Sequence, residues 1–327
     1  MRSTKLLSWT RRLLGFEAVP GPPHVFQLER RHLRYGQFQR AGGGFRFRAL
    51  RSAELPADAF HSGPLGGPLR DPAGFKERLG GLLRDVPGGV REASLVLPDA
   101  WLRVTFTEIG DLPKPREARD EVLRWKLKRL VPFRVEELRV GAAEVTALPS
   151  QEEPRRLLLG FAVEQLLGQL EEAFAAHRVR IGQVTNASLA LAGALVPEPG
   201  ERFTALVVVD EEGFSLVFVR GSEPVLHRYK AFTGSLPEAA RASLVSRDLK
   251  LTRNFLEESF PQTGLGRVLL VAPPELEPLW LDRLAEGLGR EAAPLDGRHL
   301  PPLQGEGTTA PWRELAPLLG AARQEVA

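Results

Sequence analysis

Residues 203–220 read FTALVVVDEEGFSLVFVR. Two apolar runs, rich in β-branched and aromatic side chains, flank a short acidic turn that ends at Gly213. Such a pattern is typical of an antiparallel hairpin with both strands buried. The elements predicted to follow are a strand at 225–231, a helix from Pro237 to about Phe260, a strand at 267–272, a helix at 275–288, a weak strand at 292–295 and a helix from Pro311 to about Gln324.

The first half of the chain predicts the same order of elements. They are strands at 24–29, 33–39 and 45–50, a helix at 72–84, a strand at 93–97, a helix at 164–177, a strand at 180–184, and a helix that Asn186 caps and that ends before Pro197. A repeat of about half the chain indicates a duplicated domain. Three strands followed by alternating helices and strands predict a mixed sheet covered by helices. The predicted fold class is therefore α/β, a duplicated actin-like (ribonuclease H-like) fold with two lobes.

This order of elements divides the chain into three parts. Residues 1–23 form a basic amphipathic segment and a proline-rich linker, 24–197 the first lobe, and 198–327 the second lobe. The first lobe carries an insertion at 98–163, which reads as a small α+β subdomain with its own strands and helix.

Composition excludes several classes of function. The chain has 327 residues and no cysteine, which excludes disulfides and cysteine-based zinc sites. The net charge is only +3, without the clustered cations that nucleic-acid binding requires. No apolar run approaches the roughly 20 residues of a membrane-spanning helix. These features favour a cytoplasmic protein that binds no nucleic acid.

The N-terminal stretch 5–16, KLLSWTRRLLGF, has apolar residues at helical spacing with cations between them. A basic amphipathic helix of this kind can lie in a membrane interface, here the inner leaflet of the inner membrane. The alternative is a terminal helix docked on its own protein or on a partner. The residues expected to meet lipid are Leu6, Trp9, Arg11, Arg12 and Leu13.

The insertion carries a specific resemblance. Residues 121–137, EVLRWKLKRLVPFRVEE, are similar to a stretch of PilM, the actin-like protein of type IV pilus assembly, in which a tryptophan-bearing helix ends at a Pro-Phe pair followed by acidic residues. The matching residues are Trp125, Pro132, Phe133, Glu136 and Glu137. Another interpretation is a helix that buries the apolar stripe of Leu123 and Leu127 against a sheet and exposes its cations to solvent.

The resemblance implies a partner. In PilM relatives, a groove between the first lobe and the insertion binds the extended cytoplasmic N-terminus of the membrane protein PilN. The residues expected to line such a groove here are Leu95, Leu97, Trp125, Pro132, Phe133, Leu157 and Leu159. Other pilus or secretion assembly proteins, and further copies in an oligomer or ring, are also expected partners. A related interpretation is the cytoplasmic part of the type II secretion L-subunit, which also uses this fold.

The loops that hold nucleotide in actin-like ATPases depart from their usual pattern. The phosphate-binding turns need glycine for close approach of the backbone, but the turn at 27–32 has none. The second turn adds Glu211 and Glu212 where a phosphate would lie, and the third loop, 271–275, contains two prolines without amide hydrogens. A lid subdomain has no room, because Phe232 is followed almost directly by the helix at Pro237. The vestigial positions are Glu29, Asp210, Gly213, Gly234 and Pro273.

We therefore expect a non-catalytic scaffold without cofactor or metal. The alternative is an ATP-binding, actin-like ATPase with a degenerate site. Other chemistry finds no support in the sequence, which has neither a Walker A loop nor a nucleophile elbow. The six histidines are isolated in the sequence, which favours surface or core positions over metal ligation.

Overall fold

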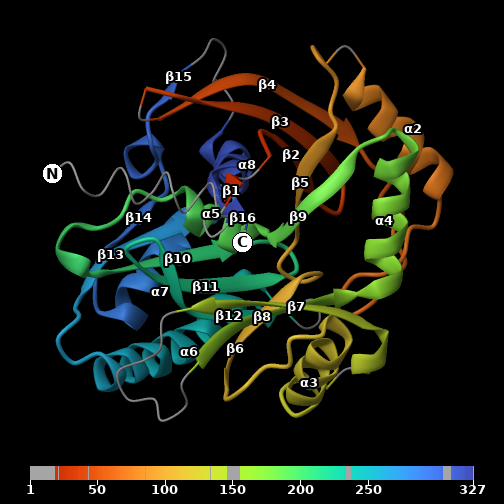
Figure 1. Cartoon of the computed structure of the whole chain (residues 1–327). Helices are drawn as coiled ribbons and strands as arrows, with labels where there is room; N and C mark the ends of the chain where they lie inside the picture. The colour runs from red at the N-terminus through yellow and green to blue at the C-terminus, as the bar shows by residue number, and fades with distance from the viewer. Residues whose placement is uncertain are drawn as a thin grey trace, which may run out of the picture.

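The computed structural model describes residues 19–20, 22–42, 44–84, 86–132, 134–145, 155–232, 237–304 and 311–326. The chain forms two lobes, each built on one sheet, and a smaller subdomain inserted in the first lobe (Figure 1). All five residues expected at a membrane surface (Leu6, Trp9, Arg11, Arg12 and Leu13), together with Phe133 and Gly234, lie outside the described residues.

The first lobe contains a six-stranded mixed sheet in the order β15-β4-β3-β2-β5-β9. Strands β2, β3 and β4 form an antiparallel meander, and β5 and then β9 run parallel to β2. The sheet is therefore mixed, as the sequence predicts. The strand bounds are β2 His24–Leu28, β3 His32–Ala41, β4 Gly44–Glu54, β5 Glu92–Leu97, β9 Arg180–Asn186 and β15 Leu303–Gln304.

Helices cover both faces of this sheet. On one face, α2 (Pro72–Leu83) and α4 (Glu164–Ala176) bury a core that includes Phe26, Tyr35 and Phe174. The other face packs on α5 (Ala187–Ala194), whose predicted cap is confirmed, since Asn186 Oδ1 accepts a 3.0 Å hydrogen bond from the Leu189 amide.

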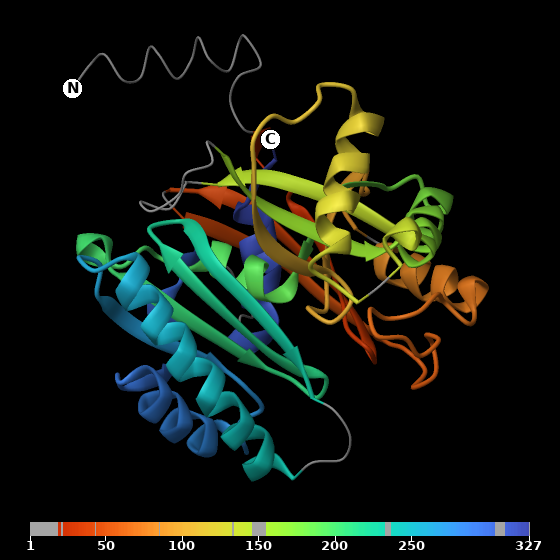
Figure 2. The ribbon, with the colours of Figure 1, turned by 90° about the horizontal axis from the view of Figure 1, so that it is seen from below.

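The second lobe repeats this plan with a five-stranded sheet in the order β12-β11-β10-β13-β14. The hairpin predicted at 203–220 is present and buried, and the strand predicted at 225–231 pairs antiparallel with its second strand. Figure 2 shows α6 and α7 layered on the outer face of this sheet. The bounds are β10 Phe203–Val209, β11 Gly213–Arg220, β12 Glu223–Ala231, α6 Glu238–Ser259, β13 Leu265–Val271, α7 Glu277–Leu288 and β14 Ala292–Pro294.

The C-terminal helix α8 (Trp312–Arg323) departs from the expected division, which assigns 198–327 to the second lobe. It packs against α5 and against the first-lobe sheet, while β15 pairs with β4. The buried side chains of α8, among them Leu315 and Leu319, belong to a core shared by the inner faces of both sheets. After α8, β16 (Glu325–Val326) pairs with β1 (Val19–Pro20), so the two ends of the described chain meet.

The insertion is a three-stranded antiparallel sheet in the order β6-β8-β7 with one helix on it. Leu123 and Leu127 of the helix are buried against the sheet, as the apolar stripe predicts. The bounds are β6 Arg103–Ile109, α3 Arg116–Lys128, β7 Leu138–Val145 and β8 Arg155–Val163, with short 3-10 helices at Val135–Glu137 here and at Pro199–Glu201 and Gly297–His299 in the second half.

The insertion also contacts the second lobe. Strand β6 lies beside β12, and the buried Arg156 of β8 donates a 2.6 Å hydrogen bond to the carbonyl of Val225. The same guanidinium lies 4.2 Å from the centre of the Phe106 ring. The inserted subdomain is thereby held against both lobes. None of the helices within the described residues is long and apolar enough to cross a membrane.

Candidate functional site

The first hairpin turns of the two lobes meet in space, as the duplicated fold requires. Arg30, in the turn between β2 and β3, donates through Nε to Glu212 Oε1 of the turn between β10 and β11 at 2.9 Å. Its Nη2 lies at the same distance from that oxygen. Actin-like ATPases hold phosphates between these turns, whereas here an arginine and a glutamate side chain extend between them.

The two acidic vestigial residues have local partners. Glu29 accepts a 2.9 Å hydrogen bond from Gln27 Nε2 and forms an ion pair with Arg34. Asp210 Oδ1 accepts hydrogen bonds from the amides of Glu212 and Gly213, each at 2.8 Å, and so closes its own turn. Each of the two carboxylates thus has hydrogen-bond or ion-pair partners within the protein.

Asp210 is exposed to solvent as a residue, although many protein atoms surround its carboxyl group. Desolvation, which outweighs the hydrogen bonds from the turn, raises the pKa of Asp210 to about 7, and the neighbouring Asp99 adds to this increase. A carboxyl group that is partly protonated near neutral pH is a weak ligand for magnesium.

Gly213 and Pro273 also have structural explanations. A Cβ atom at Gly213 would lie 2.4 Å from the Lys230 carbonyl oxygen, so glycine is needed here for close approach of β12. The carbonyl of Pro273 accepts a 2.9 Å hydrogen bond from the Leu276 amide, just before α7 begins. Glycine in the second turn is thus accounted for by strand packing.

Strands β12 and β6 occupy the space beside the second turn. Tyr229 Oη donates a 3.2 Å hydrogen bond to the Glu212 carbonyl, and the guanidinium of Arg103 lies 4.6 Å from the centre of the Tyr229 ring. Burial, the largest cause, raises the pKa of Tyr229 far above its ordinary value, so its hydroxyl stays protonated. The insertion therefore places Arg103 beside the tyrosine that bonds the turn between β10 and β11.

A buried polar network joins the lobes near these turns. Ser188, at the start of α5, lies 2.5 Å from Asp99 Oδ1 and 2.8 Å from Nε2 of His227 on β12. With the hydroxyl donating to Asp99, His227 donates through Nε2, and its buried Nδ1 has no partner among the described residues. A hydrolase triad places histidine between serine and aspartate; here serine occupies the middle and all three are buried. The core position expected for a histidine is confirmed for His227.

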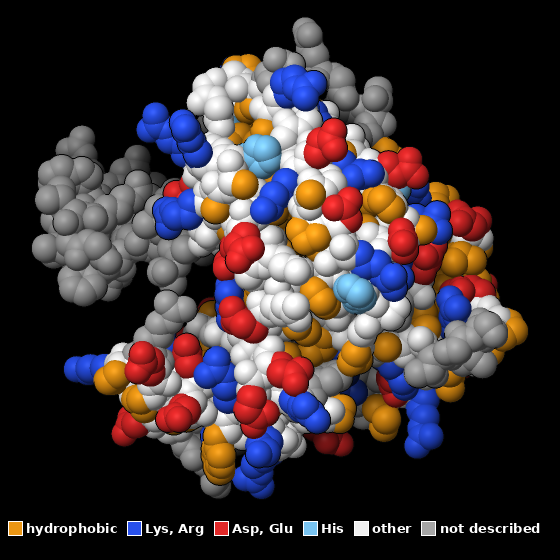
Figure 3. Space-filling view, turned by 90° about the vertical axis from the view of Figure 1, so that its right-hand side faces the viewer, with side chains coloured by type: hydrophobic (Ala, Val, Ile, Leu, Met, Phe, Trp, Pro, Cys, Tyr) orange, Lys and Arg blue, Asp and Glu red, His pale blue; other side chains and the backbone are white. Residues whose placement is uncertain are grey.

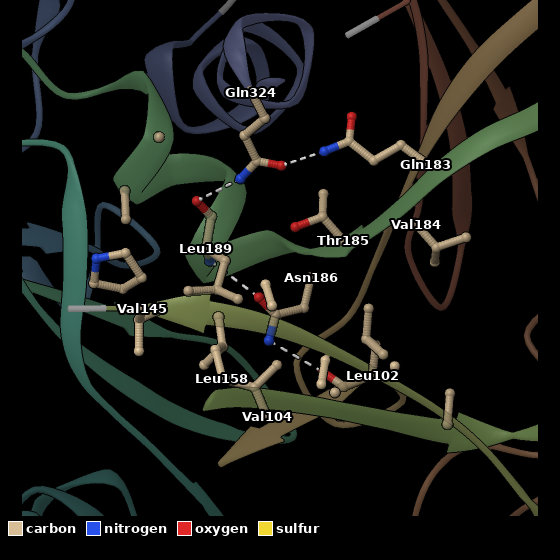
Figure 4. A pocket seen from close by; sticks show the side chains of 18 of the residues that line it. Leu102, Val104, Val145, Leu158, Gln183, Val184, Thr185, Asn186, Leu189 and Gln324 are labelled. Atoms are coloured by element: carbon tan, nitrogen blue, oxygen red, sulfur yellow. Dashed lines mark hydrogen bonds between the residues drawn. The ribbon is translucent and has the colours of Figure 1, made fainter. Parts of the chain in front are cut away.

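A cleft of about 850 Å³ separates the insertion from the first lobe (Figure 4). One wall is the face of the insertion sheet opposite α3, with Val104, Leu158, Gly160 and Ala162. Strand β9, α5 and the end of α8 form the other wall, with Gln183, Val184, Thr185, Asn186, Leu189 and Gln324.

Two edge strands of different sheets border this cleft. Strand β7 is the edge of the insertion sheet and β9 the edge of the first-lobe sheet. Alternate residues of β8 line the cleft, as expected for a strand seen from its face. Consecutive residues of β7 (139–145) and of β9 (183–186) line it, which indicates that their backbone edges border the cleft.

Hydrogen bonds between side chains and carbonyls hold the cleft walls together (Figure 4). Gln183 donates to Gln324 Oε1 at 2.7 Å, and Gln324 donates to the Leu189 carbonyl at 3.1 Å. Asn186 Nδ2 donates to the Leu102 carbonyl at 3.1 Å, across the two walls. The cleft is thus fixed in width at its inner end by a residue that also caps α5.

The residues expected to line a groove are not brought together by the structure. Leu95 and Leu97 belong to the first-lobe core, and Leu157 and Leu159 to the insertion core beneath α3, all at most 2% exposed. The cleft lies next to the alternate residues of β8, Leu158 and Gly160, which point away from the insertion core. Successive side chains of a strand point to opposite faces. Helix α3 covers the face that holds Leu157 and Leu159, so the free face of β8 holds Leu158 and Gly160.

Trp125 and Pro132 lie outside the cleft. The Trp125 side chain is 57% exposed on the outer side of α3, with Lys126 and Arg129 near its ring. Pro132 is exposed beyond the end of this helix, and no residue of α3 lines the cleft. The sequence did not indicate Gln183, Asn186 or Gln324, because the cleft joins elements that are far apart in the chain.

Comparison with solved structures agrees with this architecture. The chain is similar to one in the PilM-PilN type IV pilus biogenesis complex, with 17% identity, a TM-score of 0.64, and coverage of 94% of this chain and 96% of that one. The protein has the actin-like fold. No protein-family model matches the chain, and no curated protein sequence matches it.

Two further structures show weaker similarity. One is the cytoplasmic domain of EpsL, an inner membrane component of the type II secretion system of Vibrio cholerae, with 10% identity, a TM-score of 0.46, and coverage of 91% of this chain and 93% of that one. The other is a Bacteroides thetaiotaomicron protein of unknown function with an actin-like ATPase fold, with 9% identity, a TM-score of 0.49, and coverage of 90% and 94%.

Proposed function

We propose that this protein is a non-catalytic scaffold of a type IV pilus or related secretion assembly complex, cytoplasmic and peripheral to the inner membrane. In this proposal, the cleft between the first lobe and the insertion binds the cytoplasmic N-terminal tail of a PilN-like membrane protein. The observation that carries the proposal is the cleft itself, bordered by two strand edges in a fold shared with a chain of the PilM–PilN complex.

The cleft has the features that an extended peptide needs. An edge strand offers backbone donors and acceptors to an added strand, and pockets beside it accept alternate side chains. Here the apolar positions beside the edges are Val104, Val140 and Leu158. Gly141 and Gly160, paired across β7 and β8, leave the cleft floor open because neither has a side chain.

Strand β7 is anchored to the first lobe at Arg139, which itself lines the cleft. Arg139 donates to both carboxylate oxygens of Glu164 and to Glu171 Oε1, with distances of 2.5–2.9 Å. The hydrogen bond with Glu164 is the main cause that raises the pKa of Arg139, so the pair remains ionised. Because Glu164 and Glu171 lie on α4, a bound peptide would meet a wall fixed to the first lobe.

The binding test uses a fluorescent peptide that copies the cytoplasmic N-terminal tail of a PilN-like membrane protein from the same genome. Fluorescence anisotropy should show saturable binding, and Gly141→Ile should weaken it at least about tenfold, or about 1.4 kcal/mol. A Cβ atom at Gly141 meets nothing within 4 Å, so the substitution should fill the cleft without disturbing the fold.

Two leucine variants provide a matched comparison for the same assay. Leu158→Arg places a charge in the cleft, whereas Leu244→Arg places one at an exposed position of α6. We expect the first to abolish binding and the second to leave it unchanged. Equal affinity of all variants for the tail would refute the cleft as its binding site.

The absence of catalysis is proposed from the former nucleotide loops. The Arg30–Glu212 ion pair, the local partners of Glu29 and Asp210 and the packing requirement at Gly213 support this proposal. Isothermal titration with Mg-ATP should give no heat of binding. Micromolar affinity would instead favour the alternative, an actin-like ATPase with a degenerate site.

A further inference from the structure

A second cavity of about 850 Å³ lies in the first lobe, where β3 extends past the start of β2. It is formed by the distal parts of β3 and β4, the start of β2, and the end of α8. Among the described residues that line it, three are arginines, Arg40, Arg48 and Arg51, and none is acidic. Its apolar part includes Pro23, Phe38 and Phe45.

A bulge in β4 brings these arginines together. Phe47 pairs with Phe38 and Ala49 with Gln37, which leaves Arg48 as an additional residue. Phe45 and Phe47 precede it on the face toward α8, whereas Ala49 and Ala53 follow it on the face toward α2 and α4. Regular alternation would put residues 47 and 49 on one face, so the bulge turns Arg48 and Arg51 to the same side.

The two exposed arginines of the cavity have no carboxylate partner in the described part of the chain. Arg48 donates to Gln39 Oε1 through Nε and Nη2 at 3.2 and 2.7 Å. Arg40 makes a long 3.4 Å contact with the Arg323 carbonyl. Arg51 differs, because its guanidinium donates to the carbonyls of Leu82 and Arg84.

Within the described part of the chain, no carboxylate pairs with Arg40 or Arg48, and a further cation lies close to Arg40. Burial, and then the nearby Arg40, lower the pKa of Arg323 at the end of α8. The opposite arrangement is seen on the face shown in Figure 3, where acidic and basic side chains are interspersed. Uncompensated guanidinium groups around a cavity bind anions, and their planar donors match two phosphate oxygens at once.

We propose that this cavity binds the phosphate group of an anionic ligand, with the apolar part of the cavity holding the adjoining portion of the ligand. Pro23 lines the cavity, and the chain leads from it through β1 to the basic N-terminal segment. Anionic phospholipid and a soluble phosphate compound offer the same chemistry. Arg40 also lines the tail-binding cleft, whereas Arg48 does not, so Arg48 separates the two sites.

The test measures the full-length protein against two kinds of probe. Flotation with vesicles of phosphatidylcholine, with and without phosphatidylglycerol, tests the lipid source, and titration with pyrophosphate tests the soluble one. Arg40→Gln/Arg48→Gln should weaken binding to the responding probe about thirtyfold, corresponding to about 2 kcal/mol for two cations. Arg247→Gln/Arg290→Gln removes the same charge from exposed positions of the second lobe and should change little.

Each outcome decides the proposal. Weaker binding of either probe by Arg40→Gln/Arg48→Gln, with normal binding by the control variant, supports the proposal and identifies the ligand as lipid or soluble phosphate. Equal loss in both double variants shows a general charge effect and overturns it, as does an absence of binding to both probes. Loss only on Arg11→Gln/Arg12→Gln assigns lipid contact to the N-terminal segment and also overturns it. Tail binding by Arg48→Gln should stay normal, so failure of this proposal leaves the cleft unaffected.

Discussion

Arg30 of the first lobe and Glu212 of the second form an ion pair, with Nε and Oε1 2.9 Å apart. The two residues are 182 positions apart in the chain, in equivalent turns of the duplicated lobes. The pair joins the lobes at the point where an actin-like ATPase would join them through bound phosphates. Because side chains join the two turns here, the two lobes would not need a bound nucleotide to stay closed on each other.

A double-mutant cycle of Arg30→Ala and Glu212→Ala measures this link. The side chains are 54% and 23% exposed, so we expect a coupling energy of no more than about 1 kcal/mol. Added salt should reduce it further. Urea unfolding of the four proteins gives the value. A coupling indistinguishable from zero at low salt would show that the ion pair does not hold the lobes together.

Asp210→Asn tests the raised pKa of the second turn. Because the folded pKa of about 7 exceeds the ordinary value of 3.8, stability conferred by protonated Asp210 is complete below about pH 4 and is lost as pH rises through 7. The neutral asparagine can still accept both turn hydrogen bonds, so we expect it to stabilise the protein at pH 8 and not at pH 4.

The size of this effect should be about 1 kcal/mol. In a group shielded from solvent, a pKa shift of this size would correspond to about 4 kcal/mol of unfolding free energy. Water reaches Asp210 and screens its interactions, so the effect is smaller. Thermal unfolding of both proteins from pH 4 to 8 gives the difference. A constant difference across that range would contradict the assignment of the titration to Asp210.

Ser188→Ala removes the central member of the buried network. Asp99 would then lose a hydrogen bond, and His227 would lose its hydrogen bond with Ser188 and keep only Asp99 Oδ1 at 3.6 Å among the described residues, at a cost of about 1–3 kcal/mol. Ser243→Ala is the matched control, because this exposed hydroxyl on α6 bonds only to the Ala239 carbonyl. A loss of unfolding free energy no larger for Ser188→Ala than for the control would refute the network's contribution.

Adjacent leucines on β8 should respond in opposite ways. Leu157 is 2% exposed in the insertion core, so Leu157→Ala should cost about 2–4 kcal/mol of unfolding free energy. Leu158 faces the cleft, so Leu158→Ala should cost less stability and weaken tail binding instead. Unfolding and anisotropy on both variants check the assignment; a reversed pattern would place the tail on the α3 side.

The sequence by itself determined the order of elements, the duplication and the inserted subdomain. Each of these depends on local periodicity, such as the apolar runs at 203–220 and the Leu123–Leu127 stripe, and local periodicity is written in adjacent residues. The sequence also indicated that the phosphate turns lack glycine where it is needed, since a turn is specified by a few consecutive residues.

Only the tertiary structure decided which faces and ends meet. Helix α8 packs on α5 and the first-lobe sheet and completes a core shared by both sheets, a contact that no local pattern encodes. The cleft lies beside Leu158 and not Leu157 because α3 covers the other face of β8. Arg30–Glu212, Ser188–His227 and the arginine cavity likewise depend on side chains from separate elements, which acquire a common environment only when the lobes pack together.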